Sequence, residues 1–386
     1  MTITTTCKPM TENQRVYDLI WSQMPHMQKP TSSSWWFFIL FPKEAEGYGP
    51  RQMMFSIASR VGETISINGS MLPGIDLKRK IVDGVDIFDA IATGWYCDGE
   101  QVYDEFVEQT AVTTLSEHDG FIKCWADKSD GTQHGYEISR SINRPLALTA
   151  KIRGAKGTAE FEAWGDLDSL DSSPHESLNI NTPLGGTHFI AWRRMNFEGV
   201  FDLPTGQEEL AGICYFQRVC LNVPTFPWKW IWSLFPDGSM FSAYIPYVGR
   251  NLLRKGYQFF ASNQKEQAII PIAANGFWDW PGPSERVIFK KAGITPILGN
   301  GPHPQFMVQM SNKQGDHLSF LAAPYGHANM CIDRPVLNGR FESHWNYNEY
   351  MFRMQQLNGR VSGKHITKAT MGQAFGSLEY TWGLGL

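Results

Sequence analysis

Short runs in which apolar and polar residues alternate dominate this chain. Alternation with a period of two places the apolar side chains on one face of a β-strand. Clusters of Gly, Pro, Asn and Asp separate the runs, as expected for turns between strands. The pattern predicts strands at residues 53–57, 64–67, 187–197, 212–221, 228–235, 240–247, 287–290, 306–310 and 318–322.

Two further patterns complete the predicted elements. The continuous apolar run at residues 35–41 is typical of a fully buried strand and is too short to span a bilayer, which takes about 20 residues. Amphipathic spacing favours a helix at residues 11–23, and a second helix with weak caps is considered at residues 247–261. Many short strands without long helices between them predict an antiparallel sandwich or barrel rather than βαβ units.

The chain is long enough for more than one core. Its 386 residues fit two domains or one large all-β unit. A polar stretch with Pro and Gly at residues 202–209 is the predicted boundary, which gives domains at 1–203 and 204–386. The predicted fold class is therefore all-β, with two tandem β-barrels or sandwiches and few short helices.

Composition narrows the class of partner. Aromatic residues make up 13% and charged residues 19%, so there is aromatic surface available for a hydrophobic ligand. A net charge of −4 argues against general nucleic-acid binding, which requires a basic surface. The six cysteines include no CxxC pair, and the first residues lack a signal-peptide pattern. We expect reduced thiols in a cytoplasmic protein, and we leave peripheral membrane contact and oligomeric state open.

Three tryptophans, Trp228, Trp230 and Trp232, alternate along one predicted strand. They share one face, so they could line a cavity for a hydrophobic molecule or stabilise a carbocation through their ring faces. Ordinary core packing explains the same stripe. Nearby, Tyr215 and Gln217 share a strand face and could polarise a carbonyl or position water, or they could belong to a half-buried strand.

Two other strands carry candidate acid–base groups. His188, Trp192 and Arg194 alternate on one predicted face, where they could bind and protonate a substrate, or simply face solvent. Glu342 and His344 could form an acid–base pair beside Arg340, and a surface ion pair explains these residues equally well. The ten histidines include no HxH or HExxH pattern, so we expect no metal site and no cofactor.

Four stretches give the chain a family resemblance. Residues 212–218 (GICYFQR) resemble the Gly-x-Ala-Tyr-His-Asp-His stretch of carotenoid 1,2-hydratases, also called hydroxyneurosporene synthases, and their lipocalin-like relatives. Residues 225–232 (TFPWKWIW) are similar to a Phe-Pro-x-x-Trp-x-Trp stretch of tocopherol cyclases. Residues 34–38 (SWWFF) and 376–381 (GSLEYT) resemble the first and last motifs of the hydratase group. Fungal decalin-forming Diels–Alderases are similar more distantly.

The resemblance implies two calycin-like β domains with a ligand cavity and cofactor-free chemistry on polyene, prenyl or polyketide substrates. One position departs from it, because Gln217 stands where the hydratase motif has an acid, and Arg218 stands where that motif has a histidine. Another group would have to supply a proton. The replacement acids we consider are His188, Tyr215, Glu342 and His344, and the substrate-binding residues are Trp36, Trp192, Arg194, Arg218, Trp228, Trp230 and Trp232.

The sequence therefore predicts a cofactor-independent cyclase, isomerase or hydratase acting on a hydrophobic terpenoid, polyene or polyketide. A lipid or isoprenoid carrier without catalytic activity is the alternative. Polar groups that converge deep in the pocket favour the enzyme, and a purely apolar pocket favours the carrier. A carbohydrate-binding sandwich, the third hypothesis, requires indoles exposed on a flat face.

Overall fold

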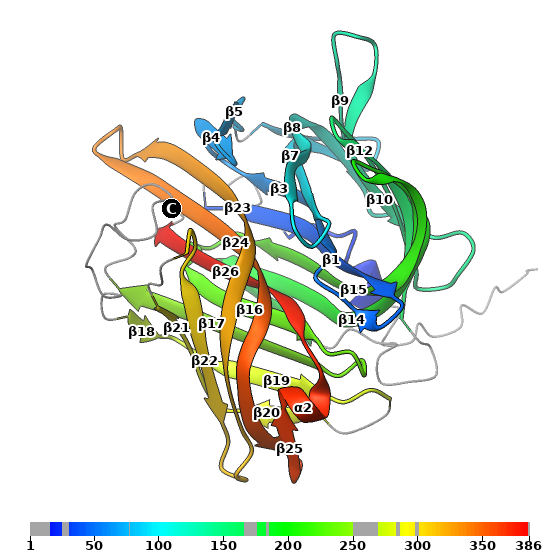
Figure 1. Cartoon of the computed structure of the whole chain (residues 1–386). Helices are drawn as coiled ribbons and strands as arrows, with labels where there is room; N and C mark the ends of the chain where they lie inside the picture. The colour runs from blue at the N-terminus through cyan, green and yellow to red at the C-terminus, as the bar shows by residue number, and fades with distance from the viewer. Residues whose placement is uncertain are drawn as a thin grey trace, which may run out of the picture.

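Antiparallel β-strands form nearly the whole of this protein. The computed structural model describes residues 16–24, 31–76, 78–165, 176–182, 185–249, 269–282, 286–297 and 301–384. The strands belong to two large sheets, which lie against each other in Figure 1. The all-β prediction is confirmed.

The first sheet closes into a ten-stranded antiparallel barrel, because β12 pairs with β14 as well as with β11. β13 (Glu176–Thr182) lies outside the ring on β14, β2 (Gly47–Tyr48) pairs with β1, and β6 (Arg79–Val82) pairs with β7. The ring runs in the order β12 (Gly157–Trp164), β11 (Leu148–Gly154), β10 (Gln133–Arg140), β9 (Phe121–Asp127), β8 (Val102–Ser116), β7 (Val85–Cys97), β3 (Gln52–Arg60), β1 (Ser33–Glu44), β15 (Gly206–Leu221) and β14 (Gly185–Leu203).

The second sheet curls around a core of its own. The short strands β18 (Ile269–Pro271) and β25 (Lys364–Thr367) pair with β17 and β24, and helix α2 (Lys368–Met371) follows β25. The main strands run in the order β20 (Val287–Phe289), β19 (Asn275–Asp279), β17 (Met240–Gly249), β16 (Trp228–Leu234), β26 (Phe375–Leu384), β24 (Phe341–Val361), β23 (His317–Val336), β22 (Gln305–Ser311) and β21 (Lys291–Ile297).

The division of the chain between the two sheets differs from the predicted domain boundary. The polar stretch at 202–209 contains the hairpin turn, at residues 204–205, between β14 and β15, which pair over almost their whole length. The chain changes sheets later, between Leu221 and Trp228. In addition, β4 (Thr64–Ile67) pairs with β23 and with β5 (Ser70–Leu72), so part of the first half extends the second sheet.

The predicted strands are all present, and the run at 35–41 lies within β1. Of the helix predicted at 11–23, residues 16–18 are helical and residues 19–23 are not, and residues 11–15 lie outside the described residues. The helix predicted at 247–261 is wrong at its start, because residues 247–249 end β17, and its remainder lies outside the described residues. No disulfide joins the five described cysteines.

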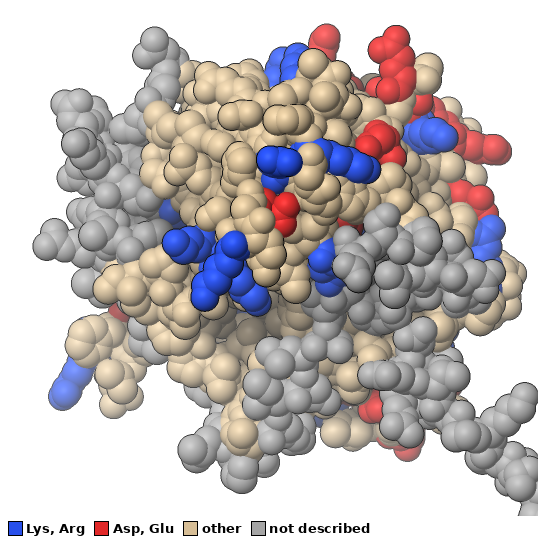
Figure 2. Space-filling model, turned by 90° about the horizontal axis from the view of Figure 1, so that it is seen from below, with Lys and Arg blue, Asp and Glu red and all other residues tan. Residues whose placement is uncertain are grey.

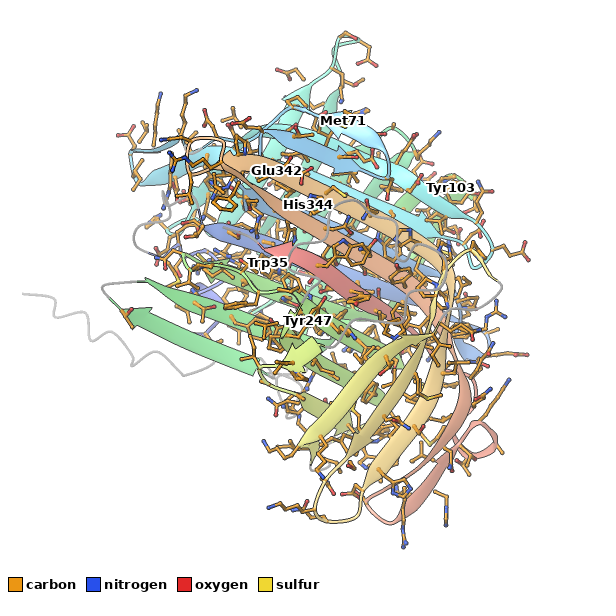
Figure 3. The ribbon with its side chains drawn as sticks, turned by 90° about the vertical axis from the view of Figure 1, so that its left-hand side faces the viewer. Trp35, Met71, Tyr103, Tyr247, Glu342 and His344 are labelled. Atoms are coloured by element: carbon orange, nitrogen blue, oxygen red, sulfur yellow. The ribbon has the colours of Figure 1, made fainter. Side chains whose placement is uncertain are left out.

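A third hydrophobic layer fills the space between the two sheets. It comprises outward-facing side chains of the barrel, such as Phe37, Ile39 and Tyr215, and side chains of β16, such as Trp230 and Trp232. Figure 3 shows Trp35 in this layer, between the ribbons of the two sheets. The outer face of the barrel is therefore apolar along β1, β3, β7 and β15, because it packs against the second sheet.

Charged side chains are dispersed over the described surface. On the face in Figure 2, Lys and Arg stand in small groups among uncharged residues, and acidic side chains gather toward one edge. Among the described helices, none has the length and apolar character needed to cross a membrane.

Candidate functional site between the two sheets

A pocket with about 800 Å³ of empty space, including its open mouth, lies between the two sheets. The barrel contributes outward-facing residues of β1, β3 and β7, including Trp35, Met54 and Trp95. The second sheet contributes residues of β16, β23, β24 and β26, and β4 covers one side with Ile67. The site therefore depends on both sheets and on the segment that passes from one to the other.

Indole rings form one wall of the pocket. Trp35 of β1 stacks on Trp228 of β16, with ring centroids 5.9 Å apart and planes 18° from parallel. Trp345 of β24 lies on another side of Trp228, at 5.1 Å between centroids. Three π faces beside one cavity provide an apolar surface that also stabilises positive charge.

Two glutamates lie at the floor, directly opposite each other in neighbouring strands. Glu349 of β24 and Glu379 of β26 are register partners. Both belong to the strand face directed at the layer between the sheets, because Met351 and Phe375 on the same faces pack in that layer. Glu379 lines the pocket, and Glu349 is fully buried behind it.

Hydrogen bonds tie these carboxyl groups together. The Tyr347 hydroxyl lies 3.0 Å from Oε1 of Glu379 and 3.1 Å from Oε2 of Glu349. The indole N–H of Trp228 donates to Oε2 of Glu379, and the Ser377 hydroxyl donates to Oε1 of Glu349 at 2.5 Å. We call Glu349, Tyr347 and Glu379 the acid cluster.

Burial perturbs both acids. Desolvation raises the pKa of Glu379 to about 7, although hydrogen bonds from Trp228 and Tyr347 oppose the rise. Desolvation, followed by the charge of Glu379, raises the pKa of Glu349 to about 8. Burial and the two carboxylates also raise the pKa of Tyr347 well above its usual value. Near neutral pH the pair therefore holds at least one proton.

The geometry around Tyr347 agrees with a shared proton. A hydroxyl has one hydrogen to donate, yet that of Tyr347 lies within hydrogen-bond distance of both carboxyl groups. If one carboxyl is protonated, it can donate to the phenol oxygen while the phenol donates to the other. Glu379 can thus hold a proton, and after losing it Glu379 can receive another from Glu349 through Tyr347.

A guanidinium group lies at the other end of the indole wall. Arg60 of β3 lines the pocket and lies over the ring of Trp345, with 4.7 Å between its Cζ and the ring centroid. Desolvation, followed by the charge of Arg334, lowers the pKa of Arg60 to about 9. Arg60 therefore stays cationic at neutral pH. The pocket has an acidic floor and a basic border, with aromatic rings between them.

The tryptophan stripe shares one strand face, as predicted, and its members differ in role. All three indoles belong to the layer between the sheets. Trp228 lines the pocket, whereas Trp230 and Trp232 pack against Tyr215 with ring centroids 5.0 and 5.9 Å away. Ordinary core packing, the alternative explanation of the stripe, therefore describes Trp230 and Trp232. Substrate contact by these two residues stays a prediction.

Tyr215 and Gln217 contact each other on the outer face of β15. The Tyr215 hydroxyl donates to Oε1 of Gln217 at 2.8 Å. Neither side chain is among those that line the pocket, and Tyr215 is almost fully buried between Phe37 and Trp230. Their catalytic roles stay predictions.

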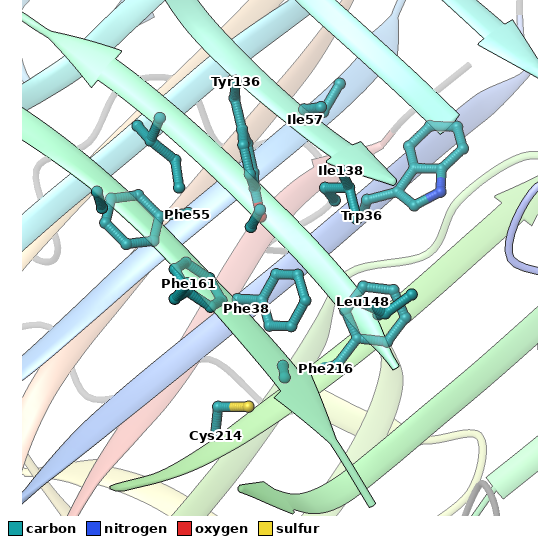
Figure 4. Close-up of a cluster of buried hydrophobic side chains, with 14 of the residues drawn as sticks. Trp36, Phe38, Phe55, Ile57, Tyr136, Ile138, Leu148, Phe161, Cys214 and Phe216 are labelled. Carbon is teal, nitrogen blue, oxygen red and sulfur yellow. The ribbon is translucent and has the colours of Figure 1, made fainter. Parts of the chain in front are cut away.

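Other predicted residues point into the closed barrel, away from the pocket. Trp36 and Trp192 belong to its aromatic core, part of which Figure 4 shows. Arg218 lies 3.7 Å from the Trp36 ring and donates to the carbonyl oxygens of Ile20 and Ser22, so it holds residues 16–24 over the barrel. Burial, followed by the charge of Arg218, lowers the pKa of His188 to about 3, which makes His188 neutral at physiological pH.

The predicted face that joined His188 and Trp192 to Arg194 is wrong. A β-bulge shifts the register of β14 between Trp192 and Met195, so Met195 points into the barrel core and Arg194 does not. Arg194 donates to the carbonyl oxygen of Gly238 in the second half of the chain. The extra residue of a bulge reverses the alternation beyond it.

Glu342 and His344 lie near the start of β24, in the upper part of Figure 3 and below Met71. The described partner of the His344 ring is Asp333 on β23, directly across the ladder, and Glu342 is exposed. The structure therefore pairs this histidine with a different carboxylate from the one predicted. Neither Glu342 nor His344 lines the pocket.

The sequence analysis missed the acid cluster. Glu379 lies inside the closing motif at 376–381, and that motif was used only to recognise the family resemblance. Tyr347 and Glu349 have the i, i+2 spacing of one strand face, which could have marked them as neighbours. The pairing of β24 with β26 brings the two glutamates together, and no pattern in a single sequence indicates which strands pair.

Comparison with known proteins adds little to this site. No family model and no curated protein matches the chain. Among solved structures, a protein described as AttH from Nitrosomonas europaea is 11% identical, has a TM-score of 0.43, and covers 90% of this chain and 91% of its own. Kievitone hydratase from Nectria haematococca is 12% identical, has a TM-score of 0.41, and covers 98% of this chain and 94% of its own. At these TM-scores neither likeness carries an argument about function.

Proposed function

We propose that this protein is a cofactor-independent enzyme that protonates a carbon–carbon double bond of a hydrophobic terpenoid, polyene or polyketide. The acid cluster at the floor of an apolar pocket is the observation that supports the proposal. A general acid works best when its pKa lies near the working pH, and burial raises the pKa of Glu379 to about 7. The converging polar groups also favour an enzyme over a carrier.

The proposed step moves one proton. The carboxyl group of Glu379 gives its proton to one alkene carbon, which forms a C–H bond and leaves a carbocation on the neighbouring carbon. The hydrogen bond from the Trp228 indole stabilises the resulting carboxylate. The faces of Trp228 and Trp345 stabilise the cation. Three outcomes return one proton to the Glu379 carboxylate: water adds and loses a proton, a second double bond closes a ring and the new cation loses a proton, or the first cation loses a proton directly.

Deuterium incorporation tests the proposal. The full-length protein would be incubated in D2O at pH 7 with farnesol, geranylgeraniol and a linear C18 tetraene acid, and the recovered compounds would be analysed by mass spectrometry. We expect carbon-bound deuterium in at least one of the compounds, and we expect Glu379→Gln to lower its rate of incorporation by about 10²- to 10⁴-fold.

Exposed Glu342 provides the matched control, because Glu342→Gln removes the same charge outside the pocket. Its rate should equal that of the wild type. Binding of the compounds without deuterium incorporation would support the carrier instead. Incorporation that is equal in wild type and Glu379→Gln would remove Glu379 from the mechanism.

A further inference from the structure

Arg60 is a partly buried cation that the proposed reaction does not use. It belongs to the same strand face as Met54 and Ser56, which is the face of β3 that lines the pocket. It also lines a second, smaller pocket near the end of the barrel, which shares Ser34 and Ser59 with the first. Arg60 therefore lies where the pocket between the sheets meets the smaller pocket.

The contacts of Arg60 leave its charge uncompensated within the described residues. Its Nη1 donates to the hydroxyls of Ser33, at 3.2 Å, and Thr225, at 3.4 Å. No carboxylate of the described residues makes an ion pair with it, and the charge that perturbs its pKa is the cation of Arg334, which lowers it. Because desolvated cations in folded proteins are normally paired with anions, this arrangement favours an anionic ligand.

The opposite end of the pocket disfavours that anion. A carboxylate beside Glu379 and Glu349 would repel any negative charge that this pair carries, and it would meet no cation of the pocket lining there. Trp345 and Glu349 are four residues apart on β24, so about 13 Å of strand separates the ring beneath Arg60 from the acid cluster. An elongated ligand that reached from Arg60 to Glu379 would pass Trp35, Trp228 and Trp345, which all line the pocket.

We propose that the pocket binds amphiphiles with a carboxylate or equally acidic head group at Arg60 and an unsaturated hydrocarbon tail directed toward Glu379. The guanidinium fork matches a carboxylate through two parallel hydrogen bonds, and the Ser33 hydroxyl lies beside it. The inference names the substrate class of the proposed enzyme and rests on that function only for the reactivity of the tail.

A matched pair of ligands tests the head-group site. Parinaric acid, a fluorescent C18 tetraene carboxylic acid, and its methyl ester have the same tail and differ in charge. We expect the wild type to bind the acid about tenfold more tightly than the ester, because a charge-assisted hydrogen bond is lost in the ester. Arg60→Gln should remove that preference by weakening acid binding alone, and Arg60→Lys should retain part of it.

Arg353→Gln is the control, because Arg353 also lies near an aromatic ring, that of Tyr325, but outside the pocket. It should keep the tenfold preference, and melting curves show which variants fold. Equal binding of acid and ester by the wild type, equal weakening of both by Arg60→Gln, or no binding of either ligand would overturn the inference. Glu379→Gln should leave the preference intact, so a failure of the proposed chemistry is distinguishable from a failure of this site.

Discussion

Glu379 and Glu349 show how a single residue acquires its chemistry from its surroundings. A solvated glutamate has a pKa near 4.3. Burial in the layer between the sheets raises the pKa of Glu379 to about 7 and that of Glu349 to about 8. Glu379 can serve as the acid because the fold destabilises its charged form, so that it keeps its proton near neutral pH.

This perturbation predicts a pH-dependent stability. Because the folded pKa of Glu349 exceeds its unfolded value, folding favours the protonated form. Its stabilising contribution is full below about pH 4.5 and is lost as pH rises toward 8. One such group changes the free energy of unfolding by at most about 1.4 kcal/mol per pH unit. We expect Glu349→Gln to give a shallower decline than the wild type between pH 5 and pH 8 in urea denaturation.

Glu342→Gln serves as the comparison for this measurement, since Glu342 is exposed. Its stability should fall with pH as steeply as that of the wild type. Parallel curves for the wild type and Glu349→Gln would show that Glu349 titrates normally in the folded protein.

At the scale of elements, close approach of β26 to β16 positions the acid cluster. Gly376 lies in β26, three residues before Glu379. A Cβ atom at Gly376 would lie 2.3 Å from the carbonyl oxygen of Trp232 and 2.6 Å from the ring of Phe352. Only a glycine fits there without movement of one strand or the other.

Gly376→Ala is therefore expected to lower the free energy of unfolding by about 1–3 kcal/mol, because overpacking displaces the backbone. Gly293→Ala in β21 provides a matched control, since the nearest atom to its Cβ would be the carbonyl oxygen of Gln309 at 4.0 Å. Urea denaturation of both variants measures the difference. Equal stabilities would contradict the close approach of β26 to β16.

The elements also show where sequence reasoning succeeds. Alternation located the strands and placed Trp228, Trp230 and Trp232 on one face, because the period of two is a local property. It failed at Arg194, where a bulge inserts one residue. The polar stretch at 202–209, from which a domain boundary was predicted, contains the hairpin turn between β14 and β15. Both features depend on strand pairing, which lies outside any single run of residues.

At the scale of the whole molecule, the candidate site belongs to neither sheet alone. Trp35 and Trp95 come from the barrel, and Trp228, Tyr347 and Glu379 come from the second sheet. The family resemblance implied a ligand cavity without placing it; side chains fill the closed barrel, and the pocket lies between the sheets. That arrangement follows from packing between distant segments, so one sequence could suggest a hydrophobic cavity and not its location.

The carboxyl titration of Glu379 tests the central claim most directly. Glutamate side chains labelled with ¹³C at the carboxyl carbon would be followed by NMR from pH 3 to pH 9, and Glu379→Gln would assign the resonance. The assembled pocket predicts a pKa of about 7 in the folded protein and an ordinary value, near 4.3, in urea. A resonance of Glu379 that titrates near 4.3 in the folded protein would contradict its role as the buried acid.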